Sequence, residues 1–354
     1  MKIGILTYHY SDNYGAVLQT FALSNILRNH GHNAEIINLI PKKNLNQTIR
    51  KFFKDRLTYN FKSFRQNHLI CKPNKPIVYH ELKTLNFSNY DVIIVGSDQV
   101  WRKSYTQGLG YSYFLDFVPN GTKKVSYAAS FGLDHYEGSP NDIKIVSELL
   151  KDFDLITTRE QSGVEICEKT FKVKADFVLD PVLLSDSIFE KFIDRSNQNT
   201  FVTQYLLDPT DQKVSFVKNV SKYFDIPTKI NYKQSNKPIT LFNSIFKRSE
   251  ETFPKVEDWI NGIANSTFVV TDSFHGVAFS ILFKKQFVCI INEKRGKTRM
   301  SNLLGILGLN HVGVSEKDLD TLKVNDITEI DYEIVNEKLS ELRKKSLDYL
   351  LSIL

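Results

Sequence analysis

The sequence has few cysteines and no long apolar run. Its three cysteines, Cys71, Cys167 and Cys289, are odd in number and lie far apart in mostly apolar segments. This pattern predicts neither a disulfide framework nor a zinc site. No run approaches the ~20 consecutive apolar residues of a membrane-spanning helix, and the N-terminus lacks a signal-peptide pattern. We therefore expect a protein of the reducing cytoplasm.

Several familiar catalytic motifs are missing too. No G-x-G-x-x-G follows the first predicted strand, and there is no Walker A sequence, no H-E-x-x-H and no G-x-S-x-G elbow. Ser273 lies only two residues before His275, which is not by itself the geometry of a catalytic triad. These absences argue against the commonest nucleotide-binding, metalloprotease and serine-hydrolase sites.

The composition is that of a globular protein with an uneven charge. The 354 residues are 42% hydrophobic and 24% charged, which fits about two domains. From Lys42 to Lys75 there are ten Lys or Arg against one acid, Asp55, a net charge of +9, whereas the whole chain carries only +6. We call residues 42–75 the basic segment.

An apolar stripe at roughly helical spacing runs through the basic segment, formed by Leu45, Ile49, Phe53, Leu57, Phe61 and Phe64. Two interpretations follow. A basic amphipathic helix can lie on an anionic membrane face or bind phosphates. A periodic apolar stripe more often packs on the protein core, which would leave the charges in water.

Strand and helix patterns alternate along the chain, which predicts an α/β protein with parallel sheets covered on both faces. The simplest architecture is two such domains facing across a cleft, at residues 1–197 and 198–332, followed by a C-terminal helix at 333–354. Predicted strands lie at 2–7, 34–39, 91–95, 124–129, 154–157, near 173, 201–206, 228–231, 268–271 and 287–291. Predicted helices lie at 16–29, 143–151, 161–169, 184–194, 213–223, 256–264, 277–283 and 300–307.

The stretch from Thr267 to Phe283 is the most informative one for function. A buried strand, Thr267 to Thr271, is followed by Asp272, Ser273, Phe274, His275 and Gly276 and then by an apolar helix. Open α/β sheets bind ligands at the carboxyl ends of strands, and the N–H groups at a helix start favour an anion. We therefore expect an anion site here, in which His275 titrates near neutral pH.

Two loops of the first half are rich in polar and aromatic residues. The first strand is followed by Asn13, Tyr14 and Gly15 and then by a helix with Gln19. This composition suits a sugar, although a plain helix cap explains it about as well. The strand at 91–95 is followed by Ser97, Asp98, Gln99 and Trp101. We favour a functional loop, with capping by Asp98 and packing by Trp101 as the alternative.

Three further charged features follow strands. Arg159 and Glu160 are expected to form an internal ion pair. Asp180 either has a functional role or only fixes an Asp-Pro turn. Arg295 and Arg299 lie in a basic loop that opens onto the last predicted helix of the second domain. With His275 they would form a site for phosphate or carboxylate, and the alternative is a solvated basic loop.

Together these loops resemble the polysaccharide pyruvyl transferase family. The matching pieces, in the family's order, are D-N-Y-G-A-V-L-Q-T at 12–20, G-S-D-Q-V-W at 96–101, S-Y-A-A-S-F-G at 126–132, D-P at 180–181 and T-D-S-F-H-G at 271–276. The resemblance implies a fold of two Rossmann-like domains of the glycosyltransferase-B type. It also implies transfer of a pyruvyl group from phosphoenolpyruvate to two hydroxyls of a sugar, which forms a cyclic ketal and releases phosphate. Better-studied members carry an arginine two positions before the histidine, where this chain has Ser273.

On this basis we predict three groups of site residues. His275 and Asp98 would be catalytic. Donor-binding residues would be Ser273, Phe274, His275, Gly276, Arg295 and Arg299, with Arg295 or Arg299 in place of the family's arginine. Acceptor-binding residues would be Asn13, Tyr14, Gly15, Gln19, Ser97, Gln99 and Trp101.

The expected partners are phosphoenolpyruvate and a sugar acceptor, for which a lipid-linked oligosaccharide is one candidate. No metal, cofactor or nucleic acid is expected. The protein would work in the cytoplasm, with a peripheral contact at the inner face of the cytoplasmic membrane as a further hypothesis. The alternatives are a glycosyltransferase that uses a nucleotide-sugar on the same fold and a sugar-binding protein without catalysis.

Overall fold

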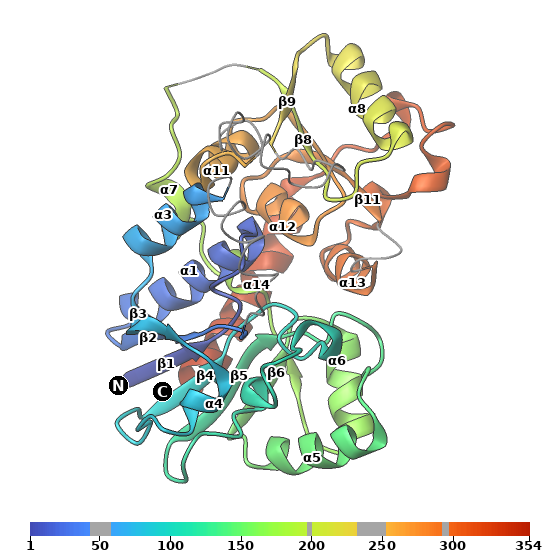
Figure 1. The fold of residues 1–354 in the computed structure, drawn as a ribbon. Coiled ribbons are helices and arrows are strands. Elements are labelled where there is room, and N and C mark those ends of the chain that lie inside the picture. The colour runs from blue at the N-terminus through green and yellow to red at the C-terminus, as the bar shows by residue number, and fades with distance from the viewer. Residues whose placement is uncertain (43–57, 197–199, 232–252, 292–296) are drawn as a thin grey trace. The chain divides into compact units, whose positions relative to one another are not determined.

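The computed structural model describes residues 1–42, 58–196, 200–231, 253–291 and 297–354 (Figure 1). The chain divides into two compact units. Unit 1 comprises Met1–Asn44, Arg65–Ser185 and Glu341–Leu354, and unit 2 comprises Leu45–Phe64 and Asp186–Ser340. The predicted division at residue 197 stays a prediction. Along the chain, the two compact units meet after Ser185, and Glu341–Leu354 belongs to unit 1.

Unit 1 is built on a parallel sheet of seven strands in the order β3-β2-β1-β4-β5-β6-β7. Every residue of β4 is buried, and because successive side chains of a strand point to opposite faces, the sheet is covered on both sides. The strands are β1 Lys2–Leu6, β2 Asn33–Leu39, β3 Cys71–Ile77, β4 Val92–Val95, β5 Lys123–Ala129, β6 Leu155–Thr158 and β7 Asp176–Phe177.

Two helices of unit 1, α1 and α5, begin at a side-chain cap. Asn13 accepts a hydrogen bond from the N–H of Ala16 at the start of α1, and Ser139 forms a capping box with Asp142 at the start of α5. The helices are α1 Tyr14–Asn29, α4 Tyr79–Leu82, α5 Pro140–Lys151 and α6 Gln161–Ile166, which continues as a π-helical turn at Cys167–Phe171. The long helix α14, Tyr332–Ser352, and α3, Tyr59–His68, each contribute to both units.

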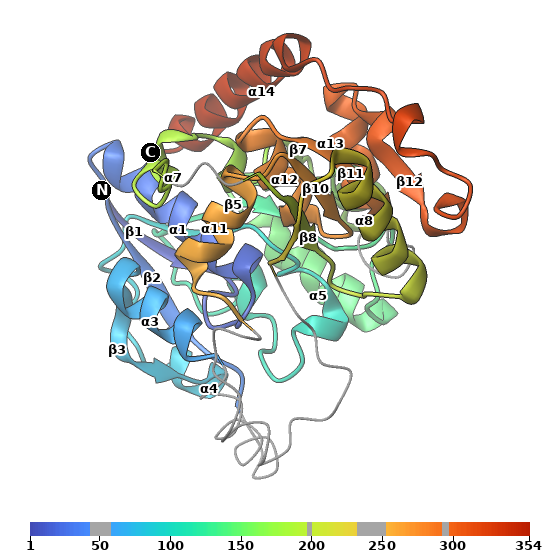
Figure 2. The same ribbon diagram turned by 90° about the horizontal axis from the view of Figure 1, so that it is seen from above.

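Unit 2 holds a second parallel sheet of five strands, in the order β12-β11-β10-β8-β9. Figure 2 shows β8, β10 and β11 side by side. The strands are β8 Val202–Tyr205, β9 Thr228–Ile230, β10 Phe268–Thr271, β11 Gln286–Ile291 and β12 Gly313–Ser315. The helices are α7 Ser187–Glu190, α8 Asp211–Phe224, α11 Val256–Ala264, α12 Phe274–Leu282 and α13 Lys297–Leu307.

These two parallel sheets confirm the predicted α/β class, and three local predictions were wrong. The strand expected near Val173 lies at Asp176–Phe177, because α6 continues into the π-helical turn. In place of a helix over 184–194 there is only α7. The basic segment does not form one helix, since its last residues form the edge strand β3.

The stripe of the basic segment is described only in part. Phe61 and Phe64 on α3 are buried, as expected of a stripe that packs on the core. Leu45, Ile49, Phe53 and Leu57 lie outside the described residues.

Candidate functional site

Each sheet has a point where the strand order reverses. In unit 1 the chain builds outward from β1 to β2 and β3, then returns to place β4 on the other side of β1. In unit 2 the same reversal occurs between β8 and β10. Doubly wound sheets bind ligands outside the carboxyl ends of the strands at such a point. The loops after β1, β4, β8 and β10 are therefore the places to examine.

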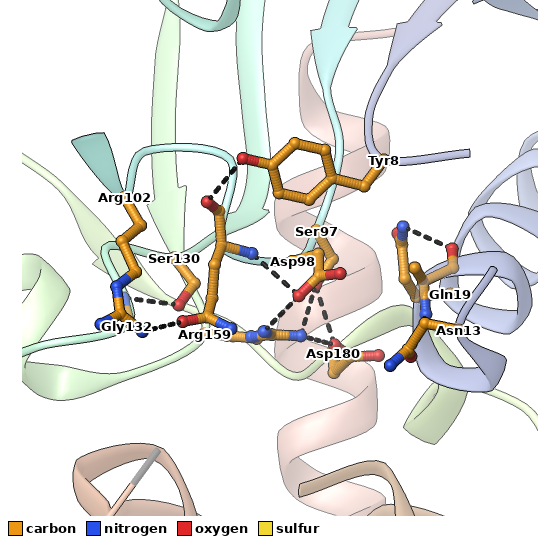
Figure 3. A network of polar contacts seen from close by, with 12 residues as sticks. Tyr8, Asn13, Gln19, Ser97, Asp98, Arg102, Ser130, Gly132, Arg159 and Asp180 are labelled. Atoms are coloured by element: carbon orange, nitrogen blue, oxygen red, sulfur yellow. Dashed lines mark hydrogen bonds and ion pairs between the residues drawn. The ribbon is translucent and has the colours of Figure 1, made fainter. Parts of the chain in front are cut away.

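In unit 1, the side chain of Arg159 joins the carboxyl ends of three strands (Figure 3). Arg159 follows β6 and its side chain is 0% exposed. Its Nη1 donates to Asp180 Oδ2 at 2.6 Å and to Ser97 Oγ at 3.2 Å. Its Nη2 donates to Asp98 Oδ1 at 3.1 Å. One guanidinium thus connects residues that follow β4 and β7 to the end of β6.

The charges around Arg159 favour its ionised form. Burial alone would lower its pKa, but the carboxylates of Asp180, Asp98 and Glu160 outweigh burial and raise the pKa. The Nε atom lies 3.9 Å from Glu160 Oε2, which confirms the predicted internal ion pair. Asp180 also accepts a hydrogen bond from the N–H of Val182 at 3.1 Å. It therefore fixes the Asp-Pro turn and pairs with Arg159 at the same time.

Asp98 has an unusual backbone conformation. Its φ is 85°, in the left-handed region that non-glycine residues seldom adopt. Its carbonyl accepts hydrogen bonds from Ser130 N at 3.0 Å and Val100 N at 2.8 Å. The side chain is 15% exposed, whereas its partners Arg159 and Asp180 are fully buried. Strained residues of this kind are concentrated at functional sites, so the geometry supports Asp98 as a site residue.

The loop after β1 is tied to the loop after β4 by buried hydrogen bonds. Thr7 Oγ1 donates to the carbonyl of Ser97 at 2.7 Å. Gln19 Nε2 donates in turn to Thr7 Oγ1 at 2.9 Å. Gln19 is therefore positioned to fix the two loops relative to each other.

The predicted acceptor-binding residues differ in exposure. Trp101 is buried, its Nε1 donates to the carbonyl of Tyr113 at 2.8 Å, and its ring stacks on Phe114 with centroids 5.6 Å apart. Of the seven, Tyr14, Gly15, Gln19, Ser97 and Trp101 are buried, Gln99 is half-buried and Asn13 is exposed. Of these seven side chains, only those of Asn13 and Gln99 are therefore open to a ligand, and that of Asn13 also caps α1.

In unit 2, four of the six predicted donor-binding residues, Ser273, Phe274, His275 and Gly276, lie at the start of α12. Ser273 is the N-cap and accepts a long hydrogen bond from Gly276 N at 3.5 Å. His275 is 7% exposed, and its ring lies edge-on to that of Phe274 at 5.2 Å. Gly276 is required for close packing, because a Cβ there would lie 2.1 Å from Thr271 Oγ1.

Arg299 reaches the same turn from α13. Its Cζ lies 5.7 Å from the centroid of the Phe274 ring, a cation–π contact, and the residue is 6% exposed. The structure thus brings a guanidinium beside the residues around His275. Arg295 lies outside the described residues.

Asp272 and Lys213, which the sequence analysis did not connect, form a buried ion pair near the start of α12. Asp272 accepts hydrogen bonds from Leu207 N at 2.5 Å and Asp208 N at 3.1 Å. Lys213 of α8 donates to Asp272 Oδ2 at 2.9 Å and is buried. This ion pair spans the strand-order reversal and holds the segment before His275. The sequence did not identify Lys213 as a site residue, because a lysine in an amphipathic helix is common.

Within the described ranges, no group of three or more His, Cys, Asp or Glu side chains could hold a metal ion. In the same ranges, no helix is both long and apolar enough to cross a membrane.

Comparison with protein families gives a match over most of the chain. The model of the family described as "Polysaccharide pyruvyl transferase" matches residues 13–294. A search of curated proteins found no match.

Solved structures share the fold at low identity. The S. aureus MnaA–UDP co-structure has a TM-score of 0.51 and 14% identity, with 100% of this chain and 97% of that chain covered. A crystal structure of UDP-N-acetylglucosamine 2-epimerase has a TM-score of 0.53 and 12% identity, with 99% and 95% covered. These likenesses establish a fold of the glycosyltransferase-B type with two Rossmann-like sheets.

Proposed function

The chain belongs to the polysaccharide pyruvyl transferase family, and from this premise we propose that it transfers a pyruvyl group from phosphoenolpyruvate to a sugar. Two hydroxyls of a sugar in a bacterial-type surface polysaccharide precursor become a cyclic ketal, and phosphate is released. The observation that carries the proposal is the family match over residues 13–294. The site geometry in each unit supports it.

The donor carries a carboxylate and a phosphate, so its site needs N–H donors and positive charge. The start of α12 supplies backbone N–H groups, with Ser273 as the N-cap and Phe274 and Gly276 in the first turn. Arg299, in cation–π contact with Phe274, supplies the charge that the family's arginine provides elsewhere. Arg295, outside the described residues, stays a second candidate.

The chemistry needs two protonations, one at carbon and one at the leaving phosphate, and two deprotonations, one at each sugar hydroxyl. A proton added to the methylene carbon of phosphoenolpyruvate makes a methyl group and leaves the neighbouring carbon cationic. One sugar hydroxyl attacks that carbon, phosphate leaves, and the second hydroxyl closes the ring. The two hydroxyl protons balance the one gained by carbon and the one gained by phosphate. We assign His275 to proton transfer or to stabilisation of the leaving phosphate, and Asp98 to the acceptor hydroxyls.

Variants of unit 2 test the donor assignment. Arg299→Ala removes a charge-assisted contact worth about 1.5–3 kcal/mol, so the affinity for phosphoenolpyruvate should fall by roughly tenfold to a hundredfold. Lys218→Ala, which removes a charge from the exposed face of α8, is the matched control and should bind normally. Equal affinity of both variants, measured by calorimetry, would exclude Arg299 as the donor's cation.

A thermal-shift screen separates this function from its alternatives, since a ligand that binds the native state raises the melting temperature. Phosphoenolpyruvate should stabilise the protein. Stabilisation by nucleotide-sugars and not by phosphoenolpyruvate would favour the glycosyltransferase, and stabilisation by sugars alone would favour a binding protein.

A further inference from the structure

Next to Asp98, the side chains of Gln99 and Arg102 carry N–H groups that could bind an additional ligand. Gln99 Oε1 accepts a hydrogen bond from Arg102 Nη1 at 3.0 Å. In the part of the chain that the structure describes, Gln99 Nε2 and Arg102 Nη2 donate to no protein atom. Both side chains are half-buried. Two adjacent donors therefore remain available at the carboxyl end of β4.

An exposed aromatic ring lies against the same guanidinium. Arg102 Cζ is 4.4 Å from the centroid of the Tyr105 ring, and Tyr105 is 46% exposed. Tyr8, whose hydroxyl donates to the carbonyl of Gln99 at 3.2 Å, bounds the cluster on the side of the β1 loop. Aromatic rings next to fixed polar groups are the usual composition of small-molecule sites.

Neighbouring loops hold this cluster in place. Glu137 Oε2 accepts hydrogen bonds from Ser104 N at 3.0 Å and Ser104 Oγ at 2.8 Å. Its Oε1 lies 3.6 Å from Arg102 Nε. Burial would raise the pKa of Glu137, but the bonds from Ser104 and the charge of Arg102 outweigh burial and lower it. Glu137 therefore stays ionised at neutral pH and fixes the turn that carries Arg102 and Tyr105.

Gly132 makes room for the two donors. Its φ is 74°, and a Cβ there would lie 2.2 Å from Gln99 Oε1 and 3.1 Å from Arg102 Cδ. Only glycine combines this backbone conformation with that space. The donor pair is thus built into the fold by three loops, those after β1, β4 and β5.

The formal charge around the N–H groups of Gln99 and Arg102 determines which ligand they can bind. Two guanidiniums face four carboxylates, a formal charge of −2, from Arg102 and Arg159 against Asp98, Glu137, Glu160 and Asp180. An anionic group would be repelled here despite the presence of Arg102. Uncharged hydroxyl and ether oxygens accept hydrogen bonds without this repulsion.

We propose that Gln99, Arg102 and Tyr105 form a subsite for an uncharged pyranose ring of the acceptor. Two oxygens of the ring accept hydrogen bonds from Gln99 Nε2 and Arg102 Nη2, and a ring face packs on Tyr105. The proposal rests on the proposed function, because it supplies the place where the acceptor sugar lies beside Asp98. It makes the enzyme selective for a neutral sugar at this subsite, whatever the carrier.

The test measures binding of methyl glycosides to the full chain in the absence of phosphoenolpyruvate. Saturation-transfer NMR and calorimetry provide the measurements. The probes are methyl glucoside, galactoside, mannoside and N-acetylglucosaminide, each beside its uronic acid counterpart where one exists. At least one neutral glycoside should bind, and its uronate should bind more weakly. Arg102→Met and Gln99→Ala should each weaken binding, by about tenfold for Arg102. Tyr105→Ala should weaken it too.

Matched controls carry the same changes elsewhere. Arg195→Met removes an exposed arginine, and Tyr223→Ala an exposed tyrosine; both should bind as the unaltered chain does. Circular dichroism checks that each variant is folded, and Gln99→Met replaces Gln99→Ala if the latter unfolds. Tighter binding of the uronate, unchanged binding by the Gln99 and Arg102 variants, or no binding of any neutral glycoside overturns the proposal. Sugar binding without phosphate release from phosphoenolpyruvate would instead refute the proposed reaction and leave the subsite standing.

Discussion

Arg159 shows how a single residue organises the site of unit 1. Its contacts with Asp98 and Asp180 span 61 and 21 positions of sequence, and it has no exposed side-chain surface. Replacing it by an uncharged residue removes the cation that pairs with the carboxylates of Asp98, Glu160 and Asp180. Loss of one partner of a buried ion pair costs about 3–5 kcal/mol.

We therefore expect Arg159→Met to lower the free energy of unfolding by about that amount. Arg195→Met, which breaks an exposed pair with Glu190, should cost no more than about 1 kcal/mol. Urea unfolding of the two variants measures the difference. Equal small losses would show that the buried carboxylates tolerate the missing cation.

His9 links stability to pH at the same scale. Its ring is buried, with Nδ1 3.1 Å from the carbonyl of Thr7 and Nε2 3.1 Å from Asn38 Oδ1. Burial lowers its pKa despite these hydrogen bonds, from an ordinary value of 6.5. The unfolded chain therefore binds the proton more readily than the folded one. The stability from neutral His9 is full above pH 6.5 and is lost as pH falls through the lower folded pKa.

For this reason we expect His9→Gln to flatten the fall in unfolding free energy as the pH drops below 6.5. His135→Gln alters an exposed histidine and serves as the control. Urea midpoints at several pH values provide the measurement. A slope in His9→Gln as steep as in the unaltered chain contradicts the assignment.

At the scale of elements, packing of α12 on its sheet depends on one glycine. A methyl group on Gly276 would meet Thr271 Oγ1 at 2.1 Å and Tyr205 Cδ1 at 2.9 Å. We expect Gly276→Ala to cost about 1–3 kcal/mol through overpacking. In α13, Gly305 has only Asn310 Oδ1 near its Cβ position, at 3.6 Å. Gly305→Ala should therefore gain up to about 1 kcal/mol from helix propensity.

Thermal unfolding of the two alanine variants checks this pair of expectations. Destabilisation of both would mean that α13 is also tightly packed at its glycine. Stabilisation of both would show that α12 can shift away from β10 without loss.

Elements with a clear hydrophobic period could be predicted from sequence, and elements held by context could not. Strand β10 and helix α11 occupy the predicted ranges, 268–271 and 256–264. Strand β3, with the sequence C-K-P-N-K-P-I, was missed because its prolines and lysines are untypical of strands. Proline is nevertheless tolerated at a sheet edge, where β3 lies.

The site was predictable to the same extent. Loops at strand ends identified Asp98 and His275 as candidates, because topology alone places such loops at one edge of a sheet. The contacts of Arg159 with Ser97, the stacking of Arg102 on Tyr105 and the pairing of Lys213 with Asp272 depend on three-dimensional packing. No spacing in the sequence reports them.

For the whole molecule, the uneven charge raises the question of where the enzyme works. The basic segment carries +9 in a chain of net charge +6, and a few Lys or Arg near an anionic bilayer contribute about 1 kcal/mol each. We propose a peripheral membrane contact through this segment, where a lipid-linked acceptor would be met. Phe61 and Phe64 are buried, so these two side chains are not available to insert into a bilayer.

Accordingly, the protein should sediment with anionic vesicles at low salt and be released at high salt. The double variant Lys51→Glu/Lys54→Glu, which reverses two charges, should bind anionic vesicles more weakly than the unaltered chain at low salt. Equal partitioning onto neutral and anionic vesicles, or none onto either, would show that the basic segment is only a solvated face.

The central claim is transfer of the pyruvyl group from phosphoenolpyruvate, and phosphorus NMR with mass spectrometry of the acceptor tests it most directly. With phosphoenolpyruvate and a panel of neutral glycosides and lipid-linked precursors, we expect inorganic phosphate to appear only together with a ketal on the sugar. His275→Ala should stay folded and form neither product. Ketal formation at the normal rate by His275→Ala would contradict the assigned role. Release of a nucleotide from a nucleotide-sugar, with phosphoenolpyruvate left intact, would contradict the reaction itself.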